Sequence, residues 1–498
     1  DNVMVAIDEF HHVSSNDSSV LGTALKNIMH NSSAHIMAMT GSYFRGDSEP
    51  ILSPEDEQLF DKVTYTYYEQ LDGYQYLKSF GIDYKFYQGS YLDALPDAID
   101  TTKKTIIHIP SINSSESTKD KYNEVDAIFD AIGNLIDRDN KTGIYTIKSK
   151  QTGKLLKVAD LVNEDGREKV QEYLRNISSA DDLDIIVALN MAKEGFDWPW
   201  AEQALTIGYR HSLTEIVQII GRVTRDSSNK THAQFTNMIE QPDAKDDAVQ
   251  YAVNQILKAI TASLLMEQVL APEIHLKRRN HKSDTPSGDA DIFIKGLKEP
   301  TTKRAQSIIE NDLPDLKAAI LQDQDVKNGI AANVDAEVMN KELIPKVVMT
   351  RYPDLSNDEV DQVSQYVVAD TVLRHAKVDS SVDQEGNTNE FLKMADKFIN
   401  VNDLDINLIE SINPFQRAYD VMSQNIDSDT LRIIERSIDA KKYDFSDEEL
   451  MQLFMNAKVF VEKTGRKPDK NSNNEEEVRM AYALAKLSDM RARRNENR

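Results

Sequence analysis

Short apolar runs alternate with segments of helical apolar spacing over the first half of the chain. Val3 to Ile7 form one apolar run, closed by Asp8-Glu9, and Ala34 to Met39 form a second, closed by Thr40-Gly41-Ser42. Between them, residues 20–29 carry apolar side chains at helical spacing. This order predicts strand, helix, strand, which is the order of a βαβ unit.

A second series of the same kind begins at Thr105. Strands that alternate with helices along a chain are typical of a parallel sheet with helices on both faces. The two series are separated by a β-rich run at 63–68 and an aromatic but polar stretch at 74–87, which we expect to bridge two domains. The sequence therefore predicts two α/β units, the first of them incomplete. The second unit has predicted strands at 105–109, 143–147, 184–189, 203–207 and 232–238, and predicted helices at 119–136, 167–174 and 213–223.

Beyond about Asp246 the apolar residues recur at helical spacing, and the rest of the chain is predicted to be mostly helical. Polar stretches that cannot bury enough apolar surface to offset their ordering entropy are predicted loops. These stretches are 280–291, 379–389 and 467–474. The expected domains are 1–97, the C-terminal part of a first α/β domain; 98–271, a complete second one; 272–440, a helical accessory region; and 441–498, a small basic helical unit.

Composition narrows the class of protein. The chain has 498 residues, with 58 Lys and Arg against 83 Asp and Glu, and a formal charge of −25. No window approaches the roughly 18 uncharged apolar residues that a membrane span requires. The absence of cysteine excludes disulfides, thiolate metal sites and cysteine nucleophiles, and it suits a reducing compartment. We expect a cytoplasmic protein with no membrane partner.

The first candidate motif is the pair Asp8-Glu9 at the end of an apolar strand. Two adjacent carboxylates in this position allow one to hold Mg²⁺, through waters or phosphate, while the other polarises an attacking water. Asp8 would serve the metal and Glu9 the water. The alternative is an ordinary acidic strand end, and this motif alone does not decide between the two.

Small hydroxyl residues close the second strand, in the turn Thr40-Gly41-Ser42. They could contact the acidic pair and relay its state. A turn of this composition is also common without any function.

Two later segments carry the strongest signal. A predicted strand at 185–189 leads into Asn190 to Pro199, and about twenty residues later comes the run from Gln218 to Arg225. Arg222 and Arg225, three apart on a predicted helix, would project from one face and could meet the phosphates of a nucleotide. Guanidinium groups stabilise charge that develops on a γ-phosphate, as in an arginine finger. The alternative is a surface arginine pair, but Gly221 beside it would cost about 1 kcal/mol in a helix without a packing reason.

In this order and spacing, the four segments resemble motifs II, III, V and VI of superfamily 2 helicases and translocases. Asp8-Glu9-Phe10-His11 is similar to the DEAH-type box, and Gln218-Ile219-Ile220-Gly221-Arg222-Val223-Thr224-Arg225 matches the family pattern Q-x-x-G-R-x-x-R. The resemblance covers roughly residues 1–270 and implies RecA-like domains that use ATP and Mg²⁺. The roles it implies are catalysis for Asp8, Glu9, Arg222 and Arg225, with Asp8 on the metal; nucleotide binding for Gly195, Asp197 and Gln218; and coupling for His11, Thr40, Gly41 and Ser42.

One family element is missing from the sequence. No G-x-x-x-x-G-K-[ST] phosphate loop occurs, and the nearest imitation, Thr152-Gly153-Lys154, is followed by Leu155 rather than a hydroxyl residue. In the family that loop precedes motif II. Since the chain also begins at Asp1 rather than Met, we expect a fragment that does not hydrolyse ATP alone.

The net charge does not exclude a nucleic-acid partner, because charges on a protein surface are screened within about 8 Å at physiological salt. Lys277, Arg278 and Arg279 form a local basic cluster that could contact phosphates, with a basic linker as the alternative. Trp198 and Trp200 flank Pro199; they would stack on a base or, as the favoured alternative, pack in the core.

The resulting hypothesis is the C-terminal portion of an ATP-dependent nucleic-acid helicase or translocase. DNA is favoured over RNA because of the repair and restriction branch that the 194–199 segment resembles. The alternatives are a motor subunit of a restriction or phage-defence complex, with a nuclease domain or subunit as partner, and a non-catalytic nucleic-acid-binding scaffold.

Overall fold

The structure is a computed structural model of the whole chain, and most residues between 3 and 487 are described. The residues that it does not describe are 1–2, 9, 11–19, 40–51, 53–55, 57–58, 62, 64, 66, 111–116, 118–119, 190–196, 210–212, 243–245, 272–273, 280–290, 383–387, 395–396, 427, 429, 432–433, 435–446, 469–475, 478, 482, 485–486 and 488–498. Two compact units are distinguished: residues 1–241 with 254–425, and residues 242–253 with 426–498.

The chain begins with the predicted βαβ unit. Strands β1 (Met4–Ile7) and β2 (His35–Ala38) are parallel and are joined through α1 (Val20–Asn31). Phe10 and Leu25 are buried together, and the Phe10 ring lies 6.1 Å from that of Phe60. Just beyond the two strands, the Phe10 N–H donates to the Met39 carbonyl oxygen at 2.9 Å. This hydrogen bond, together with the small core, holds the carboxyl ends of β1 and β2 side by side.

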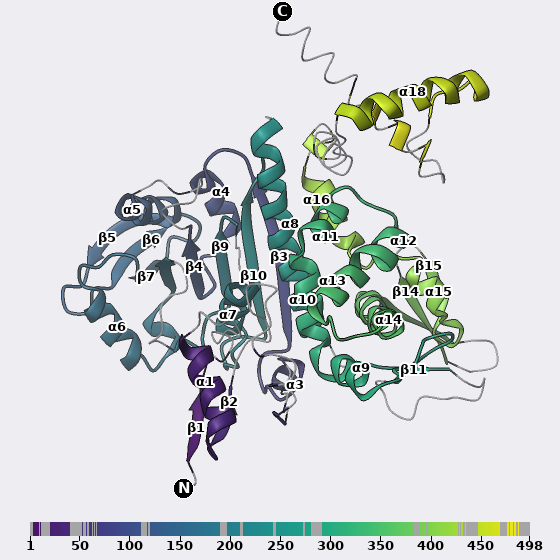
Figure 1. Ribbon diagram of the computed structural model, residues 1–498. Coiled ribbons are helices and arrows are strands. Elements are labelled where there is room, and N and C mark those ends of the chain that lie inside the picture. Colours follow the sequence, from purple (N-terminus) through teal and green to yellow (C-terminus); the bar gives the residue numbers. More distant parts are fainter. Residues whose placement is uncertain are drawn as a thin grey trace, which may run out of the picture. The chain divides into compact units, whose positions relative to one another are not determined.

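An eight-stranded sheet forms the centre of the first unit, with strand order β3-β10-β9-β4-β8-β7-β6-β5 (Figure 1). The strands from β3 to β7 in this order are parallel, and β6 and β5 continue the sheet in antiparallel fashion. The predicted α/β fold with a mainly parallel sheet is confirmed. The strands are β3 (Ser79–Tyr87), β4 (Thr105–Ile109), β5 (Gly133–Arg138), β6 (Tyr145–Ser149), β7 (Leu155–Asp160), β8 (Ile185–Leu189), β9 (Gln203–Ile207) and β10 (His232–Glu240).

Helices cover both faces of this sheet. Helices α4 (Tyr91–Ala98) and α5 (Lys121–Ile132) pack their apolar side chains on one face, in a core that includes Ile107 and Val187. The neighbouring residues along the same strands point to the opposite face. Helices α6 (Arg167–Asn176) and α7 (Leu213–Val223) contribute no residue to that core and contact β7, β9 and β10, which places them on the opposite face.

Three expectations for this region are wrong, and one strand was not predicted. The aromatic stretch at 74–87 is not a bridge, because β3 pairs along its whole length with β10 and is an edge strand of the sheet. The helix predicted at 119–136 ends at Ile132, and β5 begins at Gly133, where an added Cβ would lie 2.3 Å from the Lys148 carbonyl oxygen. Strand β7 was not predicted, and the described end of the 63–68 run enters helix α3 (Tyr67–Asp72) rather than a strand.

Strand β3 belongs to the eight-stranded sheet and α4 packs on it, and both lie on the N-terminal side of the boundary expected at residue 97, apart from the last residue of α4. The division into four domains otherwise stays a prediction.

The rest of the chain is mostly helical, as predicted, but it also contains strands. Strands β11 and β12 are parallel, and β13, β14 and β15 form an antiparallel sheet. The prediction of a loop at 379–389 is therefore wrong for its described residues, which lie in β13 and β14. Pairing with neighbouring strands satisfies the backbone hydrogen-bonding groups of these polar segments. The elements are α8 (Asp246–Val269), β11 (His275–Arg278), β12 (Asp291–Ile294), α9 (Lys303–Ser307), the π-helix η3 (Ile308–Asp312), α10 (Leu313–Gln322), α11 (Gln324–Ala331), α12 (Ala336–Val338), the π-helix η4 (Met339–Leu343), α13 (Ile344–Arg351), α14 (Asn357–Arg374), β13 (Lys377–Val382), β14 (Thr388–Met394), β15 (Lys397–Asn400), the 3₁₀-helix η5 (Val401–Asp403), α15 (Ile406–Glu410), α16 (Gln416–Asn425) and α18 (Asp447–Thr464).

The second unit contains α18, which buries Leu450 against Ala483. Arg466 forms an ion pair with the buried Glu477 within the same unit. Among the helices of the described chain, none has both the length and the apolar character needed to cross a bilayer.

Candidate functional site

Two of the residues predicted from sequence meet beside the end of α7. The Arg225 guanidinium donates from Nη1 to the Asp197 carboxylate, although the two residues are 28 positions apart. Both side chains are accessible, with 45 % of Arg225 and 66 % of Asp197 exposed. Arg225 lies two residues beyond the last residue of α7, so the expectation that both arginines project from one helix is wrong for Arg225.

Arg222 lies in the last turn of α7 and is half-buried. Burial, followed by the neighbouring charge of Arg225, lowers its pKa, and Asp197 partly offsets this effect. A guanidinium nevertheless keeps its charge in proteins. Arg222, Arg225 and Asp197 therefore form one electrostatic group in which two positive charges share a nearby carboxylate.

Lys230, a residue that the motif analysis did not single out, connects the two segments that carry this group. Its ammonium is buried and donates to the carbonyl oxygens of Pro199 at 2.9 Å and Val223 at 2.8 Å, and also to that of Ala201. Burial lowers the pKa of Lys230 to about 8. At neutral pH the ammonium thus holds the end of α7 against the segment that follows Asp197.

Asp226 fixes the other side of the same turn. Its carboxylate accepts backbone N–H groups from Gln75 at 2.8 Å and from Tyr76 and Leu77, each at 2.9 Å. Burial alone would raise the pKa of Asp226, but these three N–H donors lower it below its ordinary value. The turn after α7 is therefore anchored to the segment that leads into β3.

Gly221 faces Tyr67 of α3. A Cβ added at Gly221 would lie 3.4 Å from the Tyr67 hydroxyl oxygen, which is an ordinary van der Waals distance. Packing among the described residues therefore does not by itself require glycine here.

The acidic motif lies at the end of the other sheet. Asp8 follows β1 directly and is exposed, whereas the next apolar residue, Phe10, is buried. Mg²⁺ in nucleotide sites is held by one or two carboxylates together with phosphates and water, so an exposed carboxylate at this strand end fits such an ion. The described residues contain no group of three or more acidic or histidine side chains that would hold a metal without such a ligand. Glu9, His11, Thr40, Gly41, Ser42 and Gly195 lie outside the described residues.

The remaining predicted residues have mixed outcomes. Gln218 is half-buried on α7, on the same helix as Arg222. Trp198 is 3 % exposed, which agrees with the core alternative for this residue. In the basic cluster, Lys277 and Arg278 are exposed on β11 and Arg279 follows it, but the Lys277 ammonium contacts the Asp291 carboxylate at 2.7 Å. Asp291 therefore offsets part of the local positive charge.

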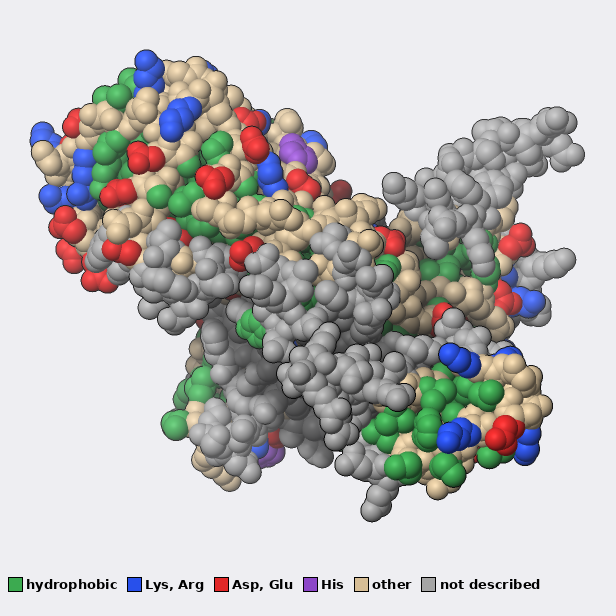
Figure 2. Space-filling view, turned by 90° about the horizontal axis from the view of Figure 1, so that it is seen from above, with side chains coloured by type: hydrophobic (Ala, Val, Ile, Leu, Met, Phe, Trp, Pro, Cys, Tyr) green, Lys and Arg blue, Asp and Glu red, His purple; other side chains and the backbone are tan. Residues whose placement is uncertain are grey.

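Charge on the molecule's surface is mixed rather than uniformly acidic. In Figure 2, Lys and Arg side chains are interspersed with Asp and Glu over the left-hand part of the molecule, where Figure 1 places β5, β6 and β7. The formal charge of −25 is thus not expressed as a continuous acidic face in this view. Local patches of the described surface therefore decide what can approach the protein.

The mainly parallel α/β sheet agrees with the RecA-like fold that the resemblance to helicases implies. Over 452 residues the chain is 60 % identical to a protein of Bacillus subtilis (strain 168) named "Putative ATP-dependent helicase YeeB", and the match covers 91 % of this chain and 75 % of that protein. Because this identity extends over three quarters of the relative, the chain belongs to the same family of ATP-dependent helicases.

Two solved helicase structures give matches of low identity. One is Mss116p DEAD-box helicase domain 2 bound to an RNA duplex, with 11 % identity, coverage of 59 % of this chain and 85 % of that chain, and a TM-score of 0.23. The other is Mycobacterium smegmatis helicase Lhr bound to ssDNA and AMP-PNP, with 11 % identity, coverage of 79 % and 58 %, and a TM-score of 0.29. These scores are too low to support any residue-level comparison. No protein-family model matches the chain.

Proposed function

We propose that the Arg225 guanidinium binds and stabilises the terminal phosphate of ATP, and that the Asp197 carboxylate holds this guanidinium when the phosphate is absent. The observation that carries this proposal is the contact between the Arg225 guanidinium and the Asp197 carboxylate. Carboxylate and phosphate oxygens both match the planar guanidinium fork, so one can replace the other as its partner. Arg222, beside this pair, would add a second positive charge toward the phosphate.

The anchoring residues support this role. Lys230 and Asp226 hold the backbone on both sides of Arg225 through hydrogen bonds to main-chain groups. A rigid backbone with one exchangeable side chain confines the motion to the guanidinium, which is what positioning of a catalytic charge requires.

Asp8 would hold Mg²⁺, which neutralises phosphate charge when it is bound with ATP. Glu9, the next residue, would orient the attacking water. Gln218 and Gly195 would contact the nucleotide, and His11 with Thr40, Gly41 and Ser42 would couple its state to the nucleic acid.

We further propose DNA rather than RNA as the polymer, on the basis of the motif that contains Asp197. Lys277, Arg278 and Arg279 would contribute phosphate contacts. A nuclease domain or subunit as partner, and a cytoplasmic location, remain parts of the same hypothesis.

The test is nucleic-acid-stimulated ATP hydrolysis by the full-length protein, with single-stranded DNA and RNA compared. Arg225→Ala should lower kcat by about 10³-fold, because an arginine that stabilises phosphoryl-transfer charge contributes on that order. Lys346→Ala removes an exposed ion pair with Asp325 and serves as the matched control. Unchanged hydrolysis in Arg225→Ala would refute the proposed role, and greater stimulation by RNA than by DNA would refute the choice of polymer.

A further inference from the structure

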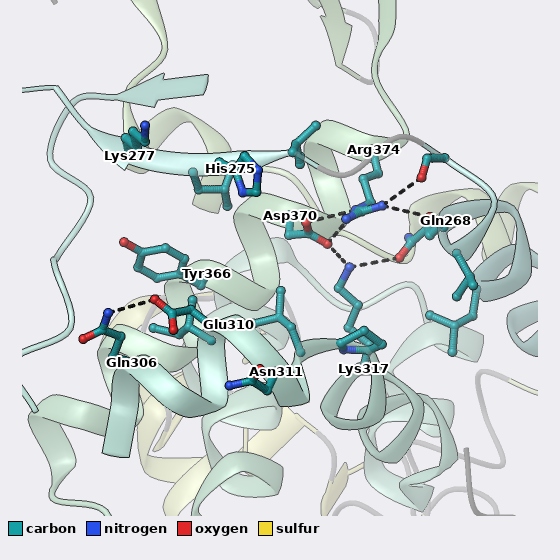
Figure 3. A pocket seen from close by; sticks show the side chains of 18 of the residues that line it. Gln268, His275, Lys277, Gln306, Glu310, Asn311, Lys317, Tyr366, Asp370 and Arg374 are labelled. Atoms are coloured by element: carbon teal, nitrogen blue, oxygen red, sulfur yellow. Dashed lines mark hydrogen bonds and ion pairs between the residues drawn. The ribbon is translucent and has the colours of Figure 1, made fainter. Parts of the chain in front are cut away.

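The helical part of the first unit contains a cavity that none of the residues proposed to act on ATP lines, although Lys277 of the basic cluster does. Its volume is about 690 Å³, within the range of small-molecule sites. The walls come from the end of α8, from β11, from the continuous helix α9-η3-α10 and from α14 (Figure 3), and Glu69 of α3 also lines the cavity.

One end of the cavity is built from buried charged side chains. The Lys317 ammonium contacts the Asp370 carboxylate, and Arg374 Nε donates to both oxygens of the same carboxylate at 3.0 Å. The Arg374 Nη1 group also donates to the Gln268 carbonyl oxygen at 3.0 Å. Two basic side chains on separate helices thus share Asp370, as Figure 3 shows.

Lys317 has fewer acceptors than donors. Its side chain is 6 % exposed, and an ammonium has three N–H donors. The described residues supply two acceptors, the Asp370 carboxylate and, at 3.4 Å, the Gln268 side-chain oxygen. Burial, which penalises the ammonium charge, and then repulsion by the nearby Arg374 charge lower the pKa of Lys317. An anion at this end of the cavity would supply the acceptor and offset the repulsion.

The opposite end of the cavity has a different character. Gln306 donates to Glu310 at 2.8 Å at the rim, and the Tyr366 ring lies along the wall between this pair and β11. Ile309 and Glu310 belong to the π-helix η3, and π-turns within α-helices occur frequently at functional sites. An amide and a carboxylate at the rim can accept hydrogen bonds from hydroxyl or amino groups, and a tyrosine ring offers a flat apolar surface.

We propose that this cavity binds a nucleoside phosphate, with the phosphate at Lys317 and Arg374 and the ring portion along Tyr366 toward Gln306. The cationic end matches a phosphate, the wall matches a planar ring, and the rim matches sugar hydroxyls or base amino groups. A free nucleotide and the 5′-terminal nucleotide of a strand present the same chemistry. The volume accommodates one such unit.

The experiment measures binding by calorimetry to the full chain. The probes are AMP, GMP and UMP, and a short oligonucleotide with either a 5′-phosphate or a 5′-hydroxyl. Monophosphates lack the terminal phosphate proposed to meet Arg225, so Arg225→Ala should leave this binding unchanged. Failure of the proposed ATPase role is therefore distinguishable from failure of this site.

Three variants test the cavity. Arg374→Gln should weaken phosphate binding by about tenfold, since it removes a charge-assisted hydrogen-bond donor. Gln306→Ala alters the rim without touching a buried residue and should weaken binding less. Ile309→Trp, at a half-buried position, fills the cavity and should abolish binding while thermal unfolding shows an intact fold. Lys346→Gln, away from the cavity, is the control.

Binding of monophosphates that is lost in Ile309→Trp would identify a free nucleotide as the ligand. Binding restricted to the 5′-phosphorylated oligonucleotide and lost in the same variant would identify a strand end. No binding by any probe, or binding that Ile309→Trp and Arg374→Gln leave unchanged, would overturn the proposal.

Discussion

The Arg225 guanidinium contacts the Asp197 carboxylate, and so joins the residue that ends one family motif to a residue of another. Exposed ion pairs of this kind contribute about 0–1 kcal/mol to stability. Since both side chains are accessible, this pair adds little to the free energy of unfolding and can exchange its partner at small energetic cost. In the role proposed for Arg225, a phosphate beside Arg222 would take the place of this carboxylate.

Asp197→Ala should release Arg225 and raise ATP hydrolysis in the absence of nucleic acid, so that the ratio of stimulated to unstimulated turnover falls. The midpoint of thermal unfolding should change little, because the pair is exposed. The measurement is steady-state hydrolysis with and without single-stranded DNA. A loss of turnover equal to that of Arg225→Ala would show instead that Asp197 positions the arginine for catalysis.

Lys230→Met should lower the free energy of unfolding by about 2 kcal/mol or more, because buried carbonyl oxygens on two segments lose their donor. Chemical denaturation measures this change. Lys346→Met is the matched control, since Lys346 is 66 % exposed and pairs with Asp325, which is 51 % exposed. Equal stability of the two variants would contradict the anchoring role of Lys230.

The stability that depends on Lys230 should vary with pH above neutrality. Its pKa is about 8 in the folded protein and has an ordinary value of 10.5, so between these values the unfolded chain binds more protons. The free energy of unfolding therefore rises with pH through this window, by an amount on the order of 1–3 kcal/mol. Denaturation at pH 7.5 and pH 9.5 should show this rise in the wild type beyond that in Lys230→Met. An identical pH dependence in both proteins would assign the effect to other groups.

Asp226→Asn should loosen the segment at 75–77 and destabilise the protein by about 1 kcal/mol near neutral pH, since its three N–H donors then lose a charged acceptor. The pKa of Asp226 is lowered in the folded state. Its contribution is therefore present above the ordinary carboxyl pKa of 3.8 and is lost as the pH falls through the lower folded value. Urea denaturation at pH 6 and pH 3 should show the gap between wild type and variant closing in acid; a gap that stays constant would count against the charge as its cause.

Elements with strong local patterns were predictable. Helix α7 occupies Leu213–Val223 as its apolar spacing predicts, and β4 and β8 match their apolar runs, because buried central strands consist of continuous β-branched and aliphatic residues. Strand β3 was missed because an edge strand is only partly buried and carries polar and aromatic residues, which do not give a buried-strand pattern. The end of α5 was misplaced because the helical apolar spacing continues past Gly133, where only the close approach of β6 requires glycine.

Sequence by itself predicted the alternation of strands and helices in the α/β part, apart from β3, β5 and β7, and identified Asp197, Arg222 and Arg225 as candidates, because periodicity and motif spacing are local properties of the chain. Tertiary structure alone decided that Arg225 contacts Asp197, that Lys230 and Asp226 anchor this site through main-chain groups, and that Lys317, Asp370 and Arg374 meet at the end of a cavity. These contacts join segments far apart in sequence, several through backbone carbonyl and N–H groups that every residue type shares. The free energy that brings them together comes from burial of the sheet and helix cores, so no single segment contains the information that specifies them.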